Sequence, residues 1–252
     1  MKYIIGDIGN TSTKICILNH KFMTLRSFIF ETNKIYKKTY AKKLFKKLLD
    51  KNTNTKILFS SVVPSVFKEI KFFFRHTKYK IIEIKDLNLK DIIKINVKNK
   101  NQLGSDRIAN AIGAYSLYKK NCLIIDFGTA TTFDIVRNPG VYEGGVIAPG
   151  IKLSILNLKQ YTASLPILNL KVNLKAYGKN TKDALNAGFL WGYQGLINNI
   201  VKKIKTSFNC NFKIILTGGY SKIFSKFINN KSTIEPNITI KGIMHIYKKL
   251  IK

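Results

Sequence analysis

The sequence predicts an α/β protein made of two halves of similar plan. Segments with the apolar pattern of strands alternate with segments whose apolar residues recur every three or four positions, as in amphipathic helices. A short turn containing an acid, a glycine and threonines lies between two apolar strands near the start of the chain, and a similar turn lies near its middle. The 252 residues, 45% of them apolar, are enough to bury a core.

The first half carries the signals of strands and helices in turn. Short apolar runs indicate strands, and the i, i+4 spacing of Tyr40, Leu44 and Leu48 indicates an amphipathic helix. Ser105 or Asp106 is expected near the N-cap of the last helix of this half. In order, the expected elements are strands at 2–7, 14–18 and 22–30, a helix over 40–49, a strand at 56–60, a helix from Pro64 to about Arg75, a strand at 80–84 and a helix at 106–118.

The same plan starts again in the second half. We therefore expect two domains, residues 1–119 and 120–252. In order, the expected elements of the second half are two strands joined by a turn within 124–136, a strand and turn at 142–150, helices near 150–158 and 181–205, a strand at 213–219 and a helix from about Lys241.

The two repeated turns have the composition of a phosphate site. GDIGNTST (6–13) aligns with IDFGTATT (125–132). Glycine permits close backbone approach, so successive N–H groups and short hydroxyls reach one small volume that suits phosphate oxygens. The carboxylate suits a cation, most simply the metal that accompanies ATP. The aligned pairs are Asp7 with Asp126, Gly9 with Gly128 and Thr13 with Thr132.

Either turn alone is better explained as ordinary hairpin chemistry, because an acid followed by glycine is common there. The repetition favours two turns that hold a triphosphate from both sides.

The net charge of +31 argues less for a nucleic-acid partner than its size suggests. Lysines occur in nearly every segment, together with abundant Asn and Ile, whereas a binding patch gathers on one face. Three scattered cysteines and three scattered histidines indicate neither a disulfide framework nor a zinc site. No apolar run reaches the roughly 18–20 residues of a membrane span, and the apolar stretch at the start is too short for a signal peptide, so we expect a cytoplasmic protein.

Six motifs, in their order and separations, resemble those of type III pantothenate kinase. The resemblance spans essentially the whole chain. It implies membership of the superfamily of acetate and sugar kinases, Hsp70 and actin, in which two ribonuclease-H-like domains with mixed central sheets flanked by helices clamp ATP. The motifs are DIGNTSTK, LGSDRIANAIGAY, IIDFGTATTFDIV, GGVIAPG, TASLP (162–166) and NTKDALNAGFLWGYQGLI (180–197).

The resemblance also implies an activity and a set of site residues. Such kinases phosphorylate pantothenate with ATP, the first step toward coenzyme A, as homodimers with Mg²⁺ and a monovalent cation, K⁺ or NH₄⁺. Asp106 would be the general base, and Asp126 would hold the monovalent cation. The residues implied at ATP are Asp7, Ile8, Gly9, Asn10, Thr11, Ser12, Thr13, Lys14 and Thr129, and those implied at pantothenate are Gly104, Ser105, Asp106, Arg107, Thr181 and Val97.

The residue types fit phosphoryl transfer. Each also has an alternative explanation in which it serves only the fold. An ionised carboxylate can accept the proton of a primary alcohol during phosphoryl transfer, and Arg107 can donate two hydrogen bonds to a carboxylate or phosphate. Alternatively, Asp106 favours the helix dipole and Arg107 is a surface cation. Thr181 can instead be an N-cap, and Lys14 can point to solvent.

The chain departs from the family pattern just before its LGSDR motif. Val97 stands where the family carries a tyrosine that packs on pantothenate, and Asn99-Lys100 stands where it carries Asn-Pro. These changes put substrate affinity and the shape of that loop in question, and they leave the phosphoryl-transfer residues in place.

Three functions are compatible with these patterns. The favoured one is the kinase. The second is a regulatory relative that binds ATP without catalysis, against which the intact Asp106 argues. The third is a nucleic-acid-binding protein, which rests on charge alone and predicts a salt-sensitive DNA shift without ATP turnover.

Overall fold

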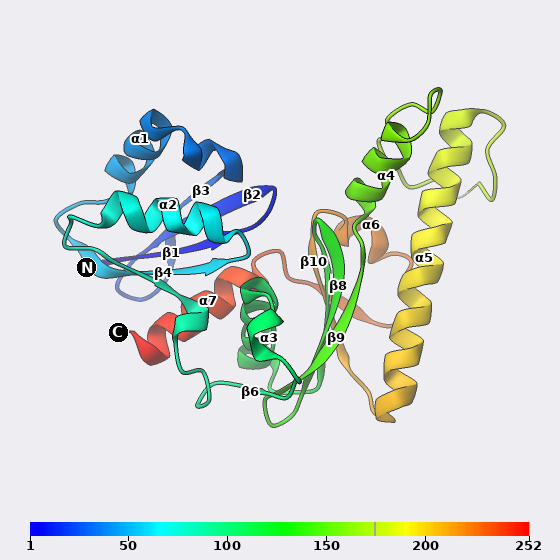
Figure 1. The fold of residues 1–252 in the computed structure, drawn as a ribbon. Coiled ribbons are helices and arrows are strands. Elements are labelled where there is room, and N and C mark those ends of the chain that lie inside the picture. The colour runs from blue at the N-terminus through cyan, green and yellow to red at the C-terminus, as the bar shows by residue number, and fades with distance from the viewer. Residues whose placement is uncertain (174, 252) are drawn as a thin grey trace. The chain divides into compact units, whose positions relative to one another are not determined.

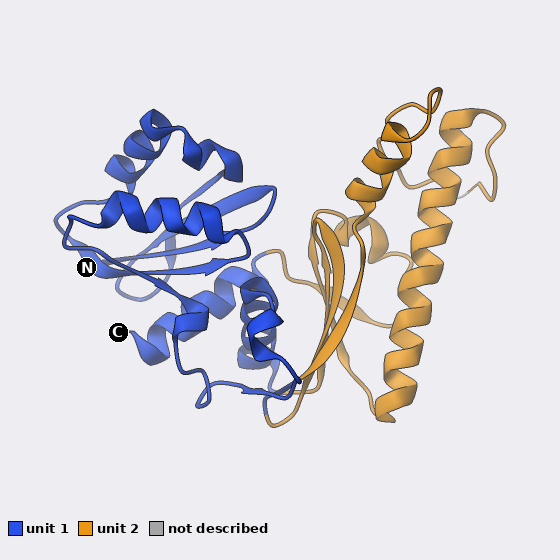
Figure 2. Ribbon diagram, viewed as in Figure 1, with its two compact units in different colours: residues 1–119, 140–142, 237–252 blue, residues 120–139, 143–236 orange. Residues whose placement is uncertain are grey.

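The computed structural model describes residues 1–173 and 175–251, which form two compact units (Figures 1 and 2). Unit 1 contains residues 1–119, 140–142 and 237–252, and unit 2 contains residues 120–139 and 143–236. The units divide at the expected residue 120, but the C-terminal segment groups with unit 1, whereas the second predicted domain includes it. The predicted domains 1–119 and 120–252 are therefore not the same as these two units, and they stay a prediction.

Unit 1 is built on a five-stranded sheet with the order β3-β2-β1-β4-β5. The first three strands are antiparallel, and β4 and β5 run parallel to β1, so the carboxyl ends of β1, β4 and β5 share one edge. Strand β1 is apolar almost throughout because both of its faces are covered. The bounds are β1 (Lys2–Ile8), β2 (Ser12–Leu18), β3 (Thr24–Glu31), β4 (Thr53–Ser61) and β5 (Lys80–Glu83).

Two pairs of helices flank this sheet (Figure 1). The apolar sides of α1 and α2 pack on one face, together with Ile4, Ile15 and Phe59 of the strands. Helices α3 and α7 contact β4 and β1 from the other face. The bounds are α1 (Lys38–Leu48), α2 (Pro64–Phe74), α3 (Ser105–Tyr118) and α7 (Ile238–Leu250), with short elements η1 (Thr32–Tyr36), η2 (Ile84–Asp86), β6 (Lys94–Ile95) and η3 (Lys100–Gln102).

Close packing of α7 on α3 explains why the last helix joins unit 1. A methyl group on Gly113 would overlap the carbonyl oxygen of Ile238, and one on Gly242 would overlap the carbonyl oxygen of Ala109. Glycine at both positions lets the two helix backbones touch. Helix α7 begins at Ile238 rather than near Lys241, where the sequence predicts its start.

Unit 2 contains most of the second sheet, whose order is β11-β10-β7-β8-β9-β6. Strands β7 and β8 form an antiparallel hairpin, and β10 and β11 extend the sheet in parallel with β7. Strand β6 and residues 141–142 of β9 group with unit 1. The bounds are β7 (Cys122–Phe127), β8 (Ala130–Arg137), β9 (Val141–Pro149), β10 (Lys213–Gly218) and β11 (Ser232–Ile234).

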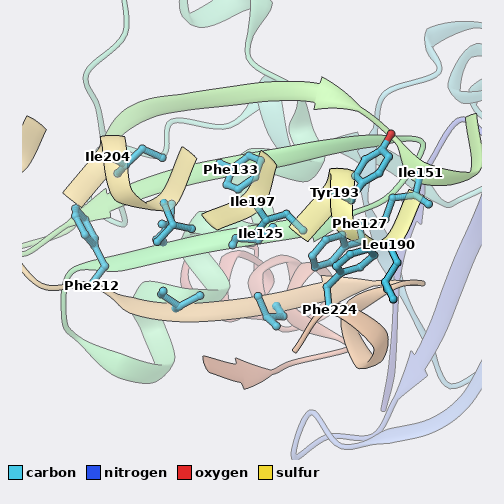
Figure 3. Packing of buried hydrophobic residues seen from close by; sticks show 14 of the residues in the cluster. Ile125, Phe127, Phe133, Ile151, Leu190, Tyr193, Ile197, Ile204, Phe212 and Phe224 are labelled. Carbon is cyan, nitrogen blue, oxygen red and sulfur yellow. The ribbon is translucent and has the colours of Figure 1, made fainter. Parts of the chain in front are cut away.

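The core of unit 2 lies between this sheet and the long helix α5 (Thr181–Phe208) (Figure 3). Phe127 and Phe133 from the hairpin pack with Leu190, Tyr193 and Ile197 from the helix. Helices α4 (Ile151–Gln160) and α6 (Ser221–Phe224) add Ile151 and Phe224 to the same cluster. Two mixed sheets flanked by helices confirm the predicted fold class.

The repeated hairpins differ by one residue in their turns. In unit 1, Ile8 pairs with Thr13 across four loop residues, and in unit 2, Phe127 pairs with Thr131 across three. Thr13 and Thr131 are both fully buried. The structural equivalent of Thr13 is therefore Thr131, and the ungapped match of Thr13 with Thr132 is wrong because the second turn is shorter.

Candidate active site

The first turn presents a short backbone loop at the edge of the unit 1 sheet. Gly9 donates its N–H to the carbonyl oxygen of Ser12 at 3.1 Å, which closes the loop. Asn10, Thr11 and Ser12 are exposed. Residues 10–12 of the predicted phosphate-binding turn thus place N–H groups and hydroxyls where a ligand can reach them.

Thr32, the first residue of η1 directly after β3, supports this turn. Its hydroxyl donates to the carbonyl oxygen of Gly9 at 2.6 Å and lies 3.0 Å from the hydroxyl of Thr13. Because the Thr32 proton is used on Gly9, Thr13 is the donor in the second bond. The N–H of Thr32 also donates to the carbonyl oxygen of Thr11 at 3.1 Å. Thr32 stands in no motif of the sequence, because only the pairing of β2 with β3 brings it beside the turn.

Lys14 does not simply extend into solvent. It lies opposite Asp7 in the β1–β2 pair, and its ammonium group donates to the side-chain oxygen of Asn237 at 2.6 Å. Asn237 directly precedes α7. Lys14 therefore connects the first turn to the start of the last helix, within unit 1.

The predicted base lies in the first turn of α3, at the same edge of the sheet. Gly104 is the N-cap residue, and the Oδ1 atom of Asp106 accepts a hydrogen bond from the N–H of Arg107 at 2.8 Å. A Cβ atom on Gly104 would lie 2.5 Å from that Oδ1 atom. Glycine therefore leaves the space into which the Asp106 carboxylate folds, and Ser105 and Asp106 directly follow the N-cap, as predicted.

Burial raises the pKa of Asp106 above the ordinary value for an aspartate, and this effect outweighs the others. The N–H of Arg107, the Arg107 charge and the Lys85 charge act in the opposite direction. A carboxylate with a raised pKa is a stronger base and accepts a proton more readily while still ionised at neutral pH.

The second turn belongs to unit 2. Asp126 is half-buried near the end of β7, and Gly128 and Thr129 are exposed in the loop that follows. A methyl group on Gly150 would overlap the backbone of Thr129 and the carbonyl oxygen of Gly128. The turn therefore rests directly on the residue that precedes α4.

Thr181 and Val97 have simple surroundings. Thr181 is exposed at the first position of α5, and the N-cap is Asn180, whose side-chain oxygen accepts from the N–H of Asp183 at 2.9 Å. The alternative in which Thr181 caps this helix is therefore wrong. Val97 is half-buried in the segment between β6 and η3.

Lys100, one of the departures from the family pattern, lines a cavity of about 580 Å³ in unit 1. Its walls also contain Lys85 and, from α3, Ile108. Further lysines, aliphatic residues and two asparagines complete the lining, so the cavity combines positive charge with apolar and amide side chains. These further residues are Leu87, Asn88, Leu89, Lys90, Ile93, Lys94, Ile95 and Asn101.

No group of three or more His, Cys, Asp or Glu side chains gathers to hold a metal within residues 1–173 and 175–251. Each turn instead contributes one carboxylate, Asp7 or Asp126. A single carboxylate beside a phosphate-binding turn, such as Asp7, fits Mg²⁺ that arrives with a nucleotide, because Mg²⁺ is commonly bound by one or two carboxylates together with substrate phosphates. No helix in the described part of the chain is long and apolar enough to cross a membrane.

Solved structures share this fold over nearly the whole chain. A Baf family protein from Campylobacter jejuni, described as a transcriptional activator, has a TM-score of 0.63 at 20% identity and covers 98% of both chains. A protein from Cytophaga hutchinsonii described as a sugar kinase has a TM-score of 0.54 at 14% identity, covering 99% of this chain and 100% of the other. The fold is that of sugar kinases and actin-like ATPases.

Sequence comparison narrows the class. The family model for type III pantothenate kinase matches residues 3–203. A type III pantothenate kinase from Pelagibacter ubique is 48% identical over 243 residues, or 96% of each chain, and one from a Sulfurihydrogenibium strain is 36% identical over 256 residues, covering 96% of this chain and 98% of the other. The chain belongs to the type III pantothenate kinase family, and it is an ATP-dependent kinase.

Proposed function

We propose that this protein transfers the γ-phosphoryl group of ATP to the primary hydroxyl of pantothenate, with Asp106 as the general base. The observation that carries the proposal is the half-buried Asp106 carboxylate at the start of α3, held over Gly104 at the sheet edge where the first turn also ends. Asp106 accepts the hydroxyl proton as the new bond to phosphorus forms.

Arg107 and the two turns supply the remaining interactions. The Arg107 guanidinium donates hydrogen bonds to the pantothenate carboxylate or to the developing charge on the phosphoryl group. Residues 10–12 donate backbone N–H groups to ATP phosphates, and Thr129 does so from the second turn. Thr181 and the Val97 segment contact pantothenate, with less ring contact than a tyrosine at position 97 would give.

Two kinds of cation complete the proposed site. Mg²⁺ comes with ATP and neutralises its phosphate charge, and Asp7 lies in the first turn to assist it. Asp126 holds the monovalent cation, K⁺ or NH₄⁺, through a carboxylate at the end of β7. When bound, each cation would supply positive charge that offsets the negative charge of the phosphates.

The experiment is ADP release with ATP and Mg²⁺, with and without pantothenate, in K⁺, NH₄⁺ or Na⁺. We expect turnover that requires pantothenate and that falls in Na⁺. In Asp126→Asn, this preference among monovalent cations should disappear. Pantothenate-independent ADP release would support a regulatory ATPase instead, and a salt-sensitive DNA shift without turnover would support a nucleic-acid-binding protein.

We also propose that the protein acts as a homodimer in the cytoplasm. Helix α4 and the residues on either side of it expose an unusual number of large apolar side chains within unit 2. Such a surface is typical of a subunit interface. These side chains include Ile147 (63% exposed), Leu153 (41%), Leu156 (43%), Leu158 (37%), Tyr161 (81%) and Ile167 (65%).

Leu156→Glu is predicted to convert the dimer into a monomer, because a charge at this position would be buried without a partner in the interface. Light scattering after size-exclusion chromatography measures the change in mass. Leu25→Glu is the matched control, since Leu25 is 51% exposed on a strand of unit 1. A dimer that survives Leu156→Glu would place the interface elsewhere.

A further inference from the structure

A buried carboxylate, that of Glu83, lies beside the helix start that carries the half-buried Asp106. Glu83 ends β5 and is only 8% exposed. Its carboxylate accepts hydrogen bonds from the Ser105 hydroxyl, from the N–H of Lys85 at 2.5 Å and from the N–H of Ser61 at 3.3 Å. One side chain therefore joins the end of β4, the turn after β5 and the first residue of α3.

The Glu83 side chain is the N-cap of η2, but its bond to Ser105 reaches beyond this local turn. Burial raises the pKa of Glu83 above its usual range, so the ionised form is destabilised, and only the three donors offset this cost. An apolar residue at the end of β5 would avoid the cost. Charged side chains are rarely buried unless they have partners, so a buried carboxylate such as Glu83 indicates a specific geometric role.

The start of α3 has a particular need for such an anchor. Its N-cap residue, Gly104, makes no side-chain capping bond, because a side chain there would meet the Asp106 carboxylate. The start of α3 therefore lacks the side-chain hydrogen bond that an N-cap serine or aspartate usually supplies. The bond from the fully buried Ser105 to Glu83 replaces it at the next position.

From this geometry we infer that Glu83 is a positioning residue for the phosphoryl-transfer reaction, which acts through Ser105 to fix the direction of the Asp106 carboxylate. The inference rests on the proposed role of Asp106 as the base. Ser105 and Asp106 are consecutive residues in the first turn of α3, so a rotation or shift of Ser105 moves Asp106 with it. A displacement of about 1 Å at a reacting group can cost about a hundredfold in rate.

The test compares Glu83→Gln, Ser105→Ala and the double variant with the wild-type protein. Each single variant is expected to lower kcat by about tenfold to a hundredfold, with little change in the KM for ATP. The double variant should be little slower than the slower single variant, because both changes remove the same interaction. Glu69→Gln is the matched control, since Glu69 is exposed on α2.

The pH dependence of kcat separates positioning from a general loss of stability. Burial raises the pKa of Asp106 against the opposing charges of Arg107 and Lys85. A loosened helix start admits water to Asp106, so the acid limb of kcat should move to lower pH in both single variants. The inference is overturned if both variants have a lowered melting temperature but keep wild-type kcat and an unmoved acid limb. Glu83 would then be a structural residue.

Asp106→Asn in the same assay separates the inferred positioning role of Glu83 from the proposed role of Asp106 as the base. If Asp106→Asn is inactive while Glu83→Gln and Ser105→Ala keep wild-type kcat, only the positioning inference is overturned. If Asp106→Asn itself keeps wild-type turnover, the proposed base is wrong and the role of Glu83 in directing it is overturned as well. Ser105→Ala keeps the test decisive if Glu83→Gln does not fold, because it removes a single oxygen atom.

Discussion

Asp106→Asn is expected to lower kcat by about 10²–10⁴-fold, the range typical for removal of a general base. The amide keeps the size of the side chain and can still accept the 2.8 Å bond from the N–H of Arg107, but it cannot take the proton of the substrate hydroxyl. Steady-state ADP release at saturating ATP and pantothenate measures the loss. Asp91→Asn, an exposed acid with no role in the site, is the control and should keep full activity.

The same variant should be at least as stable as the wild-type protein at neutral pH. Because burial raises the pKa of Asp106, its contribution to stability is complete below the unfolded-state pKa and is lost as the pH rises through the folded-state pKa. A neutral amide does not suffer this loss. Thermal unfolding of both proteins at pH 7 checks the expectation, and a clearly lowered melting temperature would show that the Asp106 carboxylate is mainly structural.

The pH profile provides a second check on Asp106. Since its pKa is raised by burial, the acid limb of kcat in the wild-type protein should lie above the value of about 3.9 that is ordinary for an aspartate. Activity should fall as the pH drops through this limb, because protonated Asp106 cannot accept a proton. A residual activity in Asp106→Asn that retains the same limb would assign the limb to another group.

Gly150→Ala is expected to disturb the second turn strongly. The added methyl group overlaps the backbone of Thr129 and the carbonyl oxygen of Gly128, which cannot move aside as the end of a flexible side chain would. Overpacking of this kind typically costs about 1–3 kcal/mol in stability, and here it also displaces the proposed ATP contact of Thr129. We expect a lower melting temperature together with a KM for ATP raised about tenfold or more.

Gly195→Ala is the matched control for Gly150→Ala. It makes the same substitution in the same unit, but a methyl group on Gly195 meets no atom within 4 Å. It lies inside α5, where alanine favours the helix over glycine by about 1 kcal/mol, so the control should be as stable as the wild type or more stable. An unchanged KM for ATP in a folded Gly150→Ala protein would contradict the proposed role of the second turn.

Local patterns in the sequence predict much of this fold. The apolar runs of β1, β4 and β10 and the i, i+4 stripe of α1 depend on residues near one another in the chain, and these elements lie close to the expected positions. The repeat of the two hairpins is likewise visible in the sequence, because the acid and the glycine of each turn keep the same spacing.

Features set by long-range packing were missed or misplaced. Thr32 and Glu83 act on the site only because strand pairing and the return of α3 bring them there, and neither stands in a recognisable motif. The match of Thr13 with Thr132 failed because an ungapped alignment cannot detect that the second turn is one residue shorter. The grouping of α7 with unit 1 depends on glycine contacts between helices far apart in sequence.

The most direct test asks whether Asp106 takes the proton or merely binds the substrate. Calorimetric titration measures the Kd of pantothenate for Asp106→Asn and for the wild-type protein, both saturated with a non-hydrolysable ATP analogue and Mg²⁺. If Asp106 is the base, the two Kd values should agree within about tenfold while kcat falls by about 10²–10⁴-fold. A Kd that rises by the same factor as kcat falls would contradict this account and make Asp106 a substrate contact.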